Sequence, residues 1–159
     1  QDREVGTAKK METHRKGLLH RAFSIFVFNS EMKLLLQKRS ESKYHSNSLW
    51  TNTCCSHPRP GEDILSAAKR RLMEEMGFIC ELKEIFVFQY KAELENEMIE
   101  NEIDHVLIGQ FDGSPMPNPD EVSDYTWISL SELKNLVQEN PQDYTIWLKN
   151  CLDRVIGYF

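Results

Sequence analysis

Residues 61–78 contain the densest group of side chains that could do chemistry. Arg70 and Arg71 each precede a glutamate by four residues, so on a helix each arginine and its glutamate lie on one face. Exposed intrahelical salt bridges would account for both pairs, and such pairs are common and weak. The other interpretation is a helix end whose charges bind metal or phosphate, and four-residue spacing alone does not choose between the two.

The loop just before this helix, residues 50–58 (WTNTCCSHP), places Cys55 two residues before His57. A structural zinc site usually shows paired C-x2-C or H-x3-H ligands, which are absent here. A lone cysteine is more often a small buried hydrophobe. Its position beside the charged helix adds a third interpretation, a reactive thiol.

A second acidic pair, Glu100 and Glu102, lies in a segment with strand character. Residues two apart on a strand project to the same face, which Asp104 would extend. The segment is either an exposed acidic edge or two carboxylates that converge on a metal or a proton-transfer site. With His14, His20 and His57, these glutamates would give three imidazoles and two carboxylates, a donor set suited to Mn²⁺, Fe²⁺ or Zn²⁺.

The elements that must position these groups follow from hydrophobic patterning. Residues 22–28 form an apolar, β-branched and aromatic run, and residues 62–76 carry apolar side chains at helical spacing before Gly77. Ser129 is a candidate helix N-cap. The mixture lacks a regular βαβ order and predicts an α+β fold, with helices packed on a mixed sheet. The predicted strands are 22–28, 33–39, 84–92, 102–111 and 125–128, and the predicted helices are 62–76, 130–138 and 141–157.

Length and composition limit the class of protein. The 159 residues fit a single domain, 1–159, and the net charge of −6 argues against general nucleic-acid binding. No apolar stretch approaches the roughly 18 residues that span a bilayer, and no export leader is apparent. Four cysteines without a disulfide pattern favour a reducing cytoplasm. An acidic protein that binds an anion must gather its positive charge locally.

The spacing of Glu62, seven residues, Arg70, and then Leu72, Glu74, Glu75, Gly77 and Phe78 resembles the Nudix box, G-x5-E-x7-R-E-U-x-E-E-x-G-U, where U is a bulky apolar residue. In that family the box is a loop–helix–loop whose glutamates bind divalent metal and, through it, a diphosphate. Ser56 replaces the first glycine, and Arg71 replaces the glutamate that follows the arginine. This exchange should weaken metal-assisted hydrolysis and preserve diphosphate binding.

Together with residues 19–24 (LHRAFS), 50–58 and 100–102 (ENE), the box resembles type I isopentenyl diphosphate isomerases over essentially the whole chain. That family also lacks the glutamate at the Arg71 position. The resemblance implies a Nudix-like mixed sheet flanked by helices, and interconversion of isopentenyl and dimethylallyl diphosphate by adding one proton and removing another. A small diphosphate is then the substrate, without nucleic-acid or membrane partners.

The same resemblance assigns roles to individual residues. It implies a catalytic thiol, carboxylate and tyrosine with an aromatic wall, a Mn²⁺ or Zn²⁺ site, a Mg²⁺ ligand, and four cations for the diphosphate. These are Cys55, Glu102, Tyr90 and Trp147 for catalysis; His14, His20, His57, Glu100 and Glu102 for Mn²⁺ or Zn²⁺; Glu75 for Mg²⁺; and Lys10, Arg39, Lys43 and Arg71 for the substrate.

Two other functions compete with this hypothesis. A Nudix hydrolase that cleaves a diphosphate would leave Cys55 without a role, and Arg71 counts against it. A non-catalytic metal- or phosphate-binding module would tolerate replacement of both Cys55 and Glu102.

Overall fold

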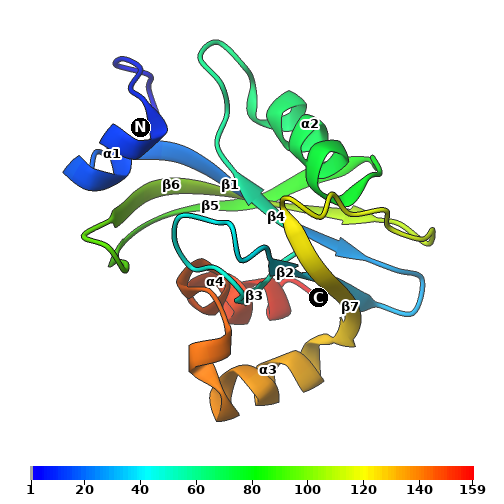
Figure 1. Ribbon diagram of the computed structural model, residues 1–159. Helices are drawn as coiled ribbons and strands as arrows, with labels where there is room; N and C mark the ends of the chain where they lie inside the picture. The colour runs from blue at the N-terminus through cyan, green and yellow to red at the C-terminus, as the bar shows by residue number, and fades with distance from the viewer. Residues whose placement is uncertain (1) are drawn as a thin grey trace.

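The computed structural model describes residues 2–159 as an α+β fold built on one seven-stranded mixed sheet (Figure 1). The strand order is β3-β2-β1-β6-β5, with β4 paired to β1 and β7 paired to β2. The elements are α1 (Lys10–Lys16), β1 (His20–Phe28), β2 (Lys33–Arg39), β3 (Trp50–Thr51), β4 (Cys54–Ser56), α2 (Ile64–Met76), β5 (Leu82–Glu93), β6 (Ile99–Gln110), β7 (Val122–Ser129), α3 (Leu130–Glu139), a 3₁₀ turn (Pro141–Asp143) and α4 (Ile146–Ile156).

The central strand β1 has neighbours on both edges. It pairs in parallel with β6, with His20 opposite Glu102, and antiparallel with β4, with Ser24 opposite Cys55. On the far side of β6, Tyr90 of β5 is opposite Glu102. This register places residues from four separate sequence segments side by side on the sheet.

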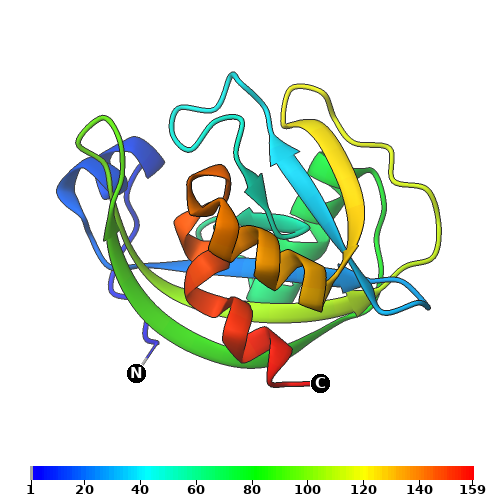
Figure 2. The same ribbon diagram turned by 90° about the horizontal axis from the view of Figure 1, so that it is seen from below.

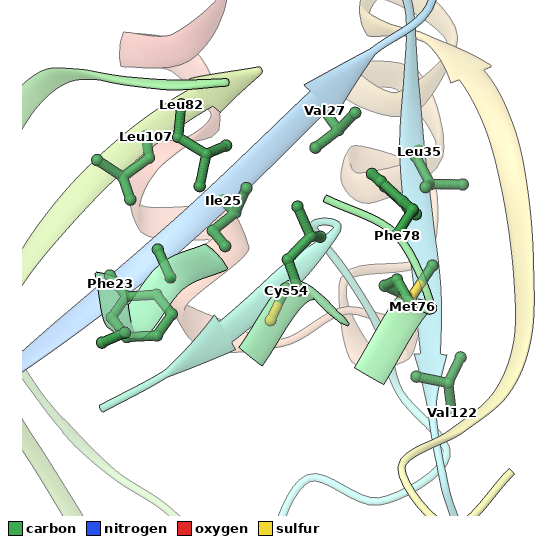
Figure 3. Packing of buried hydrophobic residues seen from close by; sticks show 13 residues of the cluster. Phe23, Ile25, Val27, Leu35, Cys54, Met76, Phe78, Leu82, Leu107 and Val122 are labelled. Atoms are coloured by element: carbon green, nitrogen blue, oxygen red, sulfur yellow. The ribbon is translucent and has the colours of Figure 1, made fainter. Parts of the chain in front are cut away.

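Helices cover both faces of the sheet. The apolar stripe of α2 packs on one face, against Phe23, Ile25 and Val27 of β1, and Figure 3 shows Cys54 within this cluster. The other face is covered by α3 and α4 (Figure 2), where Phe26 and Phe28 meet Leu148 and Leu152. Because strand side chains alternate, the even-numbered residues of β1 point toward α4 and away from α2.

The ends of α2 depend on two local features. The Asp63 side chain accepts a hydrogen bond from the Ser66 amide, so the helix begins at Ile64, two residues later than predicted. At the other end Gly77 has a φ of 73°, and a Cβ there would lie 2.2 Å from the Met116 carbonyl oxygen. Only glycine fits both the backbone conformation and the space.

The remaining predicted elements differ from the structure in their limits. All five predicted strands are present, most with longer bounds, and Ser129 caps α3 as predicted. The predicted helix 141–157 is wrong as a single element, because Tyr144 and Thr145 are extended and separate a 3₁₀ turn from α4. No helix in residues 2–159 is long and apolar enough to cross a bilayer.

Candidate active site

A small cavity of about 40 Å³ opens beside the start of β1, between α1, the loop 40–49, β4, β6 and α4. Both flanks of β1 contribute to its lining, with Cys55 from β4 on one side and Glu100 and Glu102 from β6 on the other. Trp147 of α4 and His57 also line it. A cavity needs roughly 10–15 Å³ of such volume to hold one water molecule, so this space is large enough to admit small groups.

The adjacent cysteines face opposite ways. Cys54 is fully buried in the core beneath α2, whereas Cys55 lines the cavity. The Cys55 thiol donates to Oδ1 of Asn52 at 3.0 Å, and Oγ of Ser24 lies 3.7 Å from its sulfur. Burial, and then the nearby Asp104 carboxylate, raises the pKa of the Cys55 thiol, so the protonated form is favoured.

The two glutamates share one tyrosine. The Tyr90 hydroxyl oxygen lies 2.7 Å from a carboxylate oxygen of Glu100 and 2.7 Å from one of Glu102. A hydroxyl has a single proton, so it can donate to only one of them and must accept from the other. Burial and the Glu102 charge raise the pKa of Glu100 to about 8, which makes Glu100 the carboxyl that can donate. Burial opposes ionisation of Glu102 too, but hydrogen bonds from His20 and His57 outweigh it and lower its pKa.

Three histidines from separate segments converge on Glu102. Oε1 of Glu102 lies 2.9 Å from Nε2 of His57 and 3.3 Å from Nε2 of His20, and these two nitrogens are 3.2 Å apart. Ligand atoms at right angles around an ion with bonds of about 2.1 Å lie about 3 Å apart, so this triangle has the dimensions of a coordination shell. Ligand atoms of His14, His20, His57 and Glu102 all lie within 4.8 Å of one another.

Hydrogen bonds outside the cluster orient two of the imidazoles. Nδ1 of His14 lies 2.9 Å from the Lys10 carbonyl oxygen, and Nδ1 of His20 lies 2.8 Å from that of Leu18. Each Nδ1 is thereby held by the backbone, which directs Nε2 of both rings into the site. The His14 lone pair is available there, whereas His20 would first have to release the Nε2 proton that it donates to Glu102. Nε2 of His14 is buried without a hydrogen-bond partner among residues 2–159. Burial lowers the pKa of His14 to about 4, so its ring is neutral, as a metal ligand must be.

Glu100 has a second set of neighbours. Its carboxylate, His14 and His45 form another group whose ligand atoms lie within 4.8 Å of one another. Both groups contain His14, so all five residues implied by the resemblance lie at this one site. The donor set of imidazoles and carboxylates fits a divalent transition metal.

A charged cluster lies at the α2 side of the site. The Arg71 guanidinium donates to Glu74 at 2.7 Å, Glu75 at 2.5 Å and Glu121 at 3.2 Å. Glu75 is buried and also accepts from the Gln37 side-chain amide at 2.8 Å. Lys43 pairs with Glu121. Neither Lys43 nor Arg71 lines the small cavity, whereas Lys10 and Arg39 do.

The other two expected cations contact aromatic rings. The Lys10 ammonium lies 4.8 Å from the centre of the Tyr44 ring, and the Arg39 guanidinium lies 5.1 Å from that of Trp147. Arg39 also donates to the carbonyl oxygens of His45 and Ser46, which fixes the loop 40–49 over the cavity. Arg39 therefore helps to shape the site and also adds a positive charge to it.

Several residues at the site were not singled out from the sequence. Tyr44, His45 and Ser24 line the cavity, Asn52 holds the thiol, and Glu121 joins the charged cluster. The loop residues have no periodicity that would place them. Ser24 could have been identified from the alternation of side chains along β1, because Ser24 lies on the same face as His20.

Comparison with known proteins agrees with this fold and site. The NUDIX domain profile matches residues 18–149. The chain is 57% identical, over 98% of its own length and 88% of the relative's, to "Isopentenyl-diphosphate Delta-isomerase 1" of Aromatoleum aromaticum. It is 55% identical, over 96% of its length and 86% of the relative's, to "Isopentenyl-diphosphate Delta-isomerase 2" of Photorhabdus laumondii. The chain belongs to the isopentenyl-diphosphate Delta-isomerase family of Nudix proteins.

Solved structures of more distant Nudix proteins share the fold. The MutT protein from Methanosarcina mazei superposes with a TM-score of 0.70 at 18% identity, covering 86% of this chain and 91% of that one. A MutT Nudix hydrolase from Burkholderia pseudomallei gives 0.68 at 19% identity, covering 86% and 98%. The α+β Nudix fold predicted from the sequence is thereby confirmed. The carboxylate that the box has at position 71 is an arginine in this family member.

Proposed function

We propose that this chain interconverts isopentenyl diphosphate and dimethylallyl diphosphate. The reaction moves a double bond by one position. A proton adds to the terminal alkene carbon, which leaves a tertiary carbocation, and a different proton leaves the carbon next to the diphosphate ester carbon. No atom other than hydrogen is exchanged, so the site must supply one proton and accept one.

One observation carries this proposal. A thiol and a carboxylate, Cys55 and Glu102, line the same cavity from strands on opposite edges of β1. An alkene lying over β1 between them would have a proton-transfer group at each end. In one direction of the reaction one group donates and the other accepts, and in the reverse direction the roles exchange. Tyr90, hydrogen-bonded to Glu102, orients that carboxylate and can pass a proton to it.

A carbocation survives only where water is excluded and the walls are rich in electrons. The enclosure of the cavity by α4 and the loop 40–49 supports the first requirement. Trp147, buried and lining the cavity, supports the second, because a cation over an indole face gains about 2 kcal/mol when desolvated. The Arg39 guanidinium also lies over this ring.

We assign the histidine–glutamate cluster to Mn²⁺ or Zn²⁺, held by His14, His20, His57, Glu100 and Glu102. Such an ion supplies positive charge that stabilises the carboxylates in their ionised form. We assign Glu75 to Mg²⁺, which would neutralise diphosphate charge. Diphosphate binding falls to four cations: Lys10, Arg39, Lys43 and Arg71.

The decisive experiment is isomerisation in D₂O. Incubation with isopentenyl diphosphate and divalent metal should give dimethylallyl diphosphate that carries deuterium, detected by mass spectrometry and NMR. A Nudix hydrolase would instead release phosphate or pyrophosphate, and faster release than isomerisation would replace our proposal with that function. Arg71 in place of a metal-binding carboxylate argues against hydrolysis.

We extend the proposal to a cytoplasmic location. All four cysteines are free thiols, and the proposed catalyst is one of them. A thiol that must stay reduced for every turnover suits a reducing compartment. Fractionation of cells that express the protein tests this location.

A further inference from the structure

Glu121 places a carboxylate among the cations that we assign to the diphosphate. It comes from the segment just before β7, far in sequence from both the loop 40–49 and α2. Its side chain pairs with Lys43 and, through Oε1, accepts from Arg71 at 3.2 Å. One carboxylate therefore contacts both cations.

The three carboxylates around Arg71 differ in how firmly they are held. Glu75 is buried and bound by Gln37 as well, and Glu74 lies on the same helix, one turn away. The Glu121 side chain is 23% exposed, and its two carboxylate oxygens contact only Lys43 and Arg71 in the described residues. Glu74 is more exposed, at 37%, but it also pairs with Arg70, so Glu121 is the carboxylate that these two cations alone hold among the described residues.

The backbone of Glu121 is fixed separately from its side chain. Its carbonyl oxygen accepts from the Ser40 amide at 3.0 Å, and its amide donates to the Asn118 carbonyl oxygen at 3.0 Å. Rotation about side-chain bonds would therefore move the carboxylate into solvent while the main chain stays in place. The nitrogens that Glu121 now occupies would become available to another anion.

We propose that Glu121 is a resident counter-ion that the diphosphate of the substrate displaces from Lys43 and Arg71. This inference rests on the proposed diphosphate function. A carboxylate is a planar oxygen acceptor, and a phosphoryl group is a tripodal one. Both can accept hydrogen bonds from the guanidinium fork, so one can replace the other. Glu121 lowers affinity for the diphosphate, because every binding event must first release it, and it keeps the cations separated and oriented when substrate is absent.

The test is calorimetric binding of inorganic pyrophosphate to the full chain at fixed Mg²⁺. Glu121→Gln keeps the shape of the side chain and removes its charge. Loss of a like charge close to the ligand should tighten pyrophosphate binding roughly three- to tenfold, less at high salt. Glu81→Gln is the matched control, because it changes net charge equally at an exposed residue paired with Lys69. It should leave binding unchanged.

A second variant separates displacement from positioning. Glu121→Ala should also tighten binding, since the charge is what opposes the ligand, and thermal melting checks that both variants are folded. If either folded variant binds pyrophosphate no better than the wild type, Glu121 is a positioning residue and the inference is wrong. Binding by neither wild type nor variants also overturns it. The isomerase function is judged separately, by deuterium incorporation in the wild type.

Discussion

At the scale of single residues, Cys54 and Cys55 are the clearest contrast in the molecule. They are adjacent on one strand, so one side chain enters the core beneath α2 and the other lines the cavity. The same residue type therefore serves packing in one position and is placed for proton transfer in the next. Substitution can separate the two roles because each affects a different measurement.

We expect Cys55→Ala to lower kcat about 10²- to 10⁴-fold, the usual contribution of a general acid or base, with little change in melting temperature. Cys54→Ala should do the opposite. It removes a buried sulfur, costs roughly 1 kcal/mol of stability and leaves turnover near that of the wild type. Steady-state assays and thermal melts on both variants measure this contrast, and similar activity in the two would remove Cys55 from the reaction.

Metal retention is a second expectation at this scale. His20→Ala should lose the tightly held transition metal, because Nε2 of His20 is one corner of the Glu102 triangle. Lys33→Ala is the control, since Lys33 pairs with exposed Glu31 and belongs to neither ligand group. Metal content after dialysis against a chelator is the measurement. Equal retention in both variants would show that His20 is not a ligand.

Arg71 separates diphosphate binding from chemistry. Arg71→Ala should raise KM by tenfold or more with a smaller fall in kcat, because the diphosphate is bound throughout while the alkene reacts. Arg71→Lys should be intermediate, since an ammonium keeps the charge without the planar fork. Initial rates over a range of isopentenyl diphosphate concentrations give both constants. A fall in kcat at unchanged KM would place Arg71 in the chemical step.

At the scale of elements, α2 depends on its glycine stop. Gly77→Ala must take φ near +73° and place a methyl carbon against the Met116 carbonyl oxygen, so we expect a loss of roughly 2 kcal/mol or more of unfolding free energy. Gly157→Ala, at the end of α4, has ordinary φ and a nearest contact at 3.4 Å. It should melt within a few degrees of the wild type. Urea unfolding of the two variants measures the difference.

The elements that the sequence pattern predicts are the long ones. The β1 apolar run and the α2 stripe repeat over enough residues to show their period, and both were found close to their predicted limits. The strands β3 and β4, two and three residues long, and the seven-residue α1 have too few residues for a period. The break before α4 comes from a tertiary contact, because Tyr144 forms a β-bridge with Trp50 and the Thr145 amide donates to the Trp50 carbonyl oxygen at 3.0 Å.

The functional site could also be predicted only in part from the sequence, but for a different reason. Alternation predicted that Glu100 and Glu102 share a face, and the structure confirms that they meet at Tyr90. That His14, His20 and His57 meet there depends on the parallel pairing of β1 with β6 and on the docking of α1. Neither follows from local spacing, so only resemblance to a family could assemble these residues in advance. The pairing of Glu121 with Arg71 spans fifty residues and left no trace in the sequence pattern.

At the scale of the whole molecule, the N-terminal segment joins the two faces of the sheet. Asp2 accepts from Arg21 at 2.7 Å and lies 3.1 Å from His105, both on the α2 face. Residues 3–9 then lead into α1, which places Lys10 at the cavity and His14 in the two ligand groups. The other end of α1 is fixed where the Asn101 side chain donates to the Gly17 carbonyl oxygen.

Because α1 is held at both ends, releasing the segment before it should weaken metal binding without changing any ligand. Asp2→Asn removes the charge that Arg21 and His105 share, so residues 2–9 should loosen and Lys-C should cleave after Lys9 or Lys10 several times faster than in the wild type. Bound transition metal should fall in parallel, since His14 moves with the helix. Glu31→Gln, which breaks an exposed pair with Lys33, is the matched control and should change neither measurement. Faster cleavage with full metal retention would mean that the contact with Asn101 is enough to keep α1 docked. The N-terminal segment would then pack on the sheet without supporting the metal site.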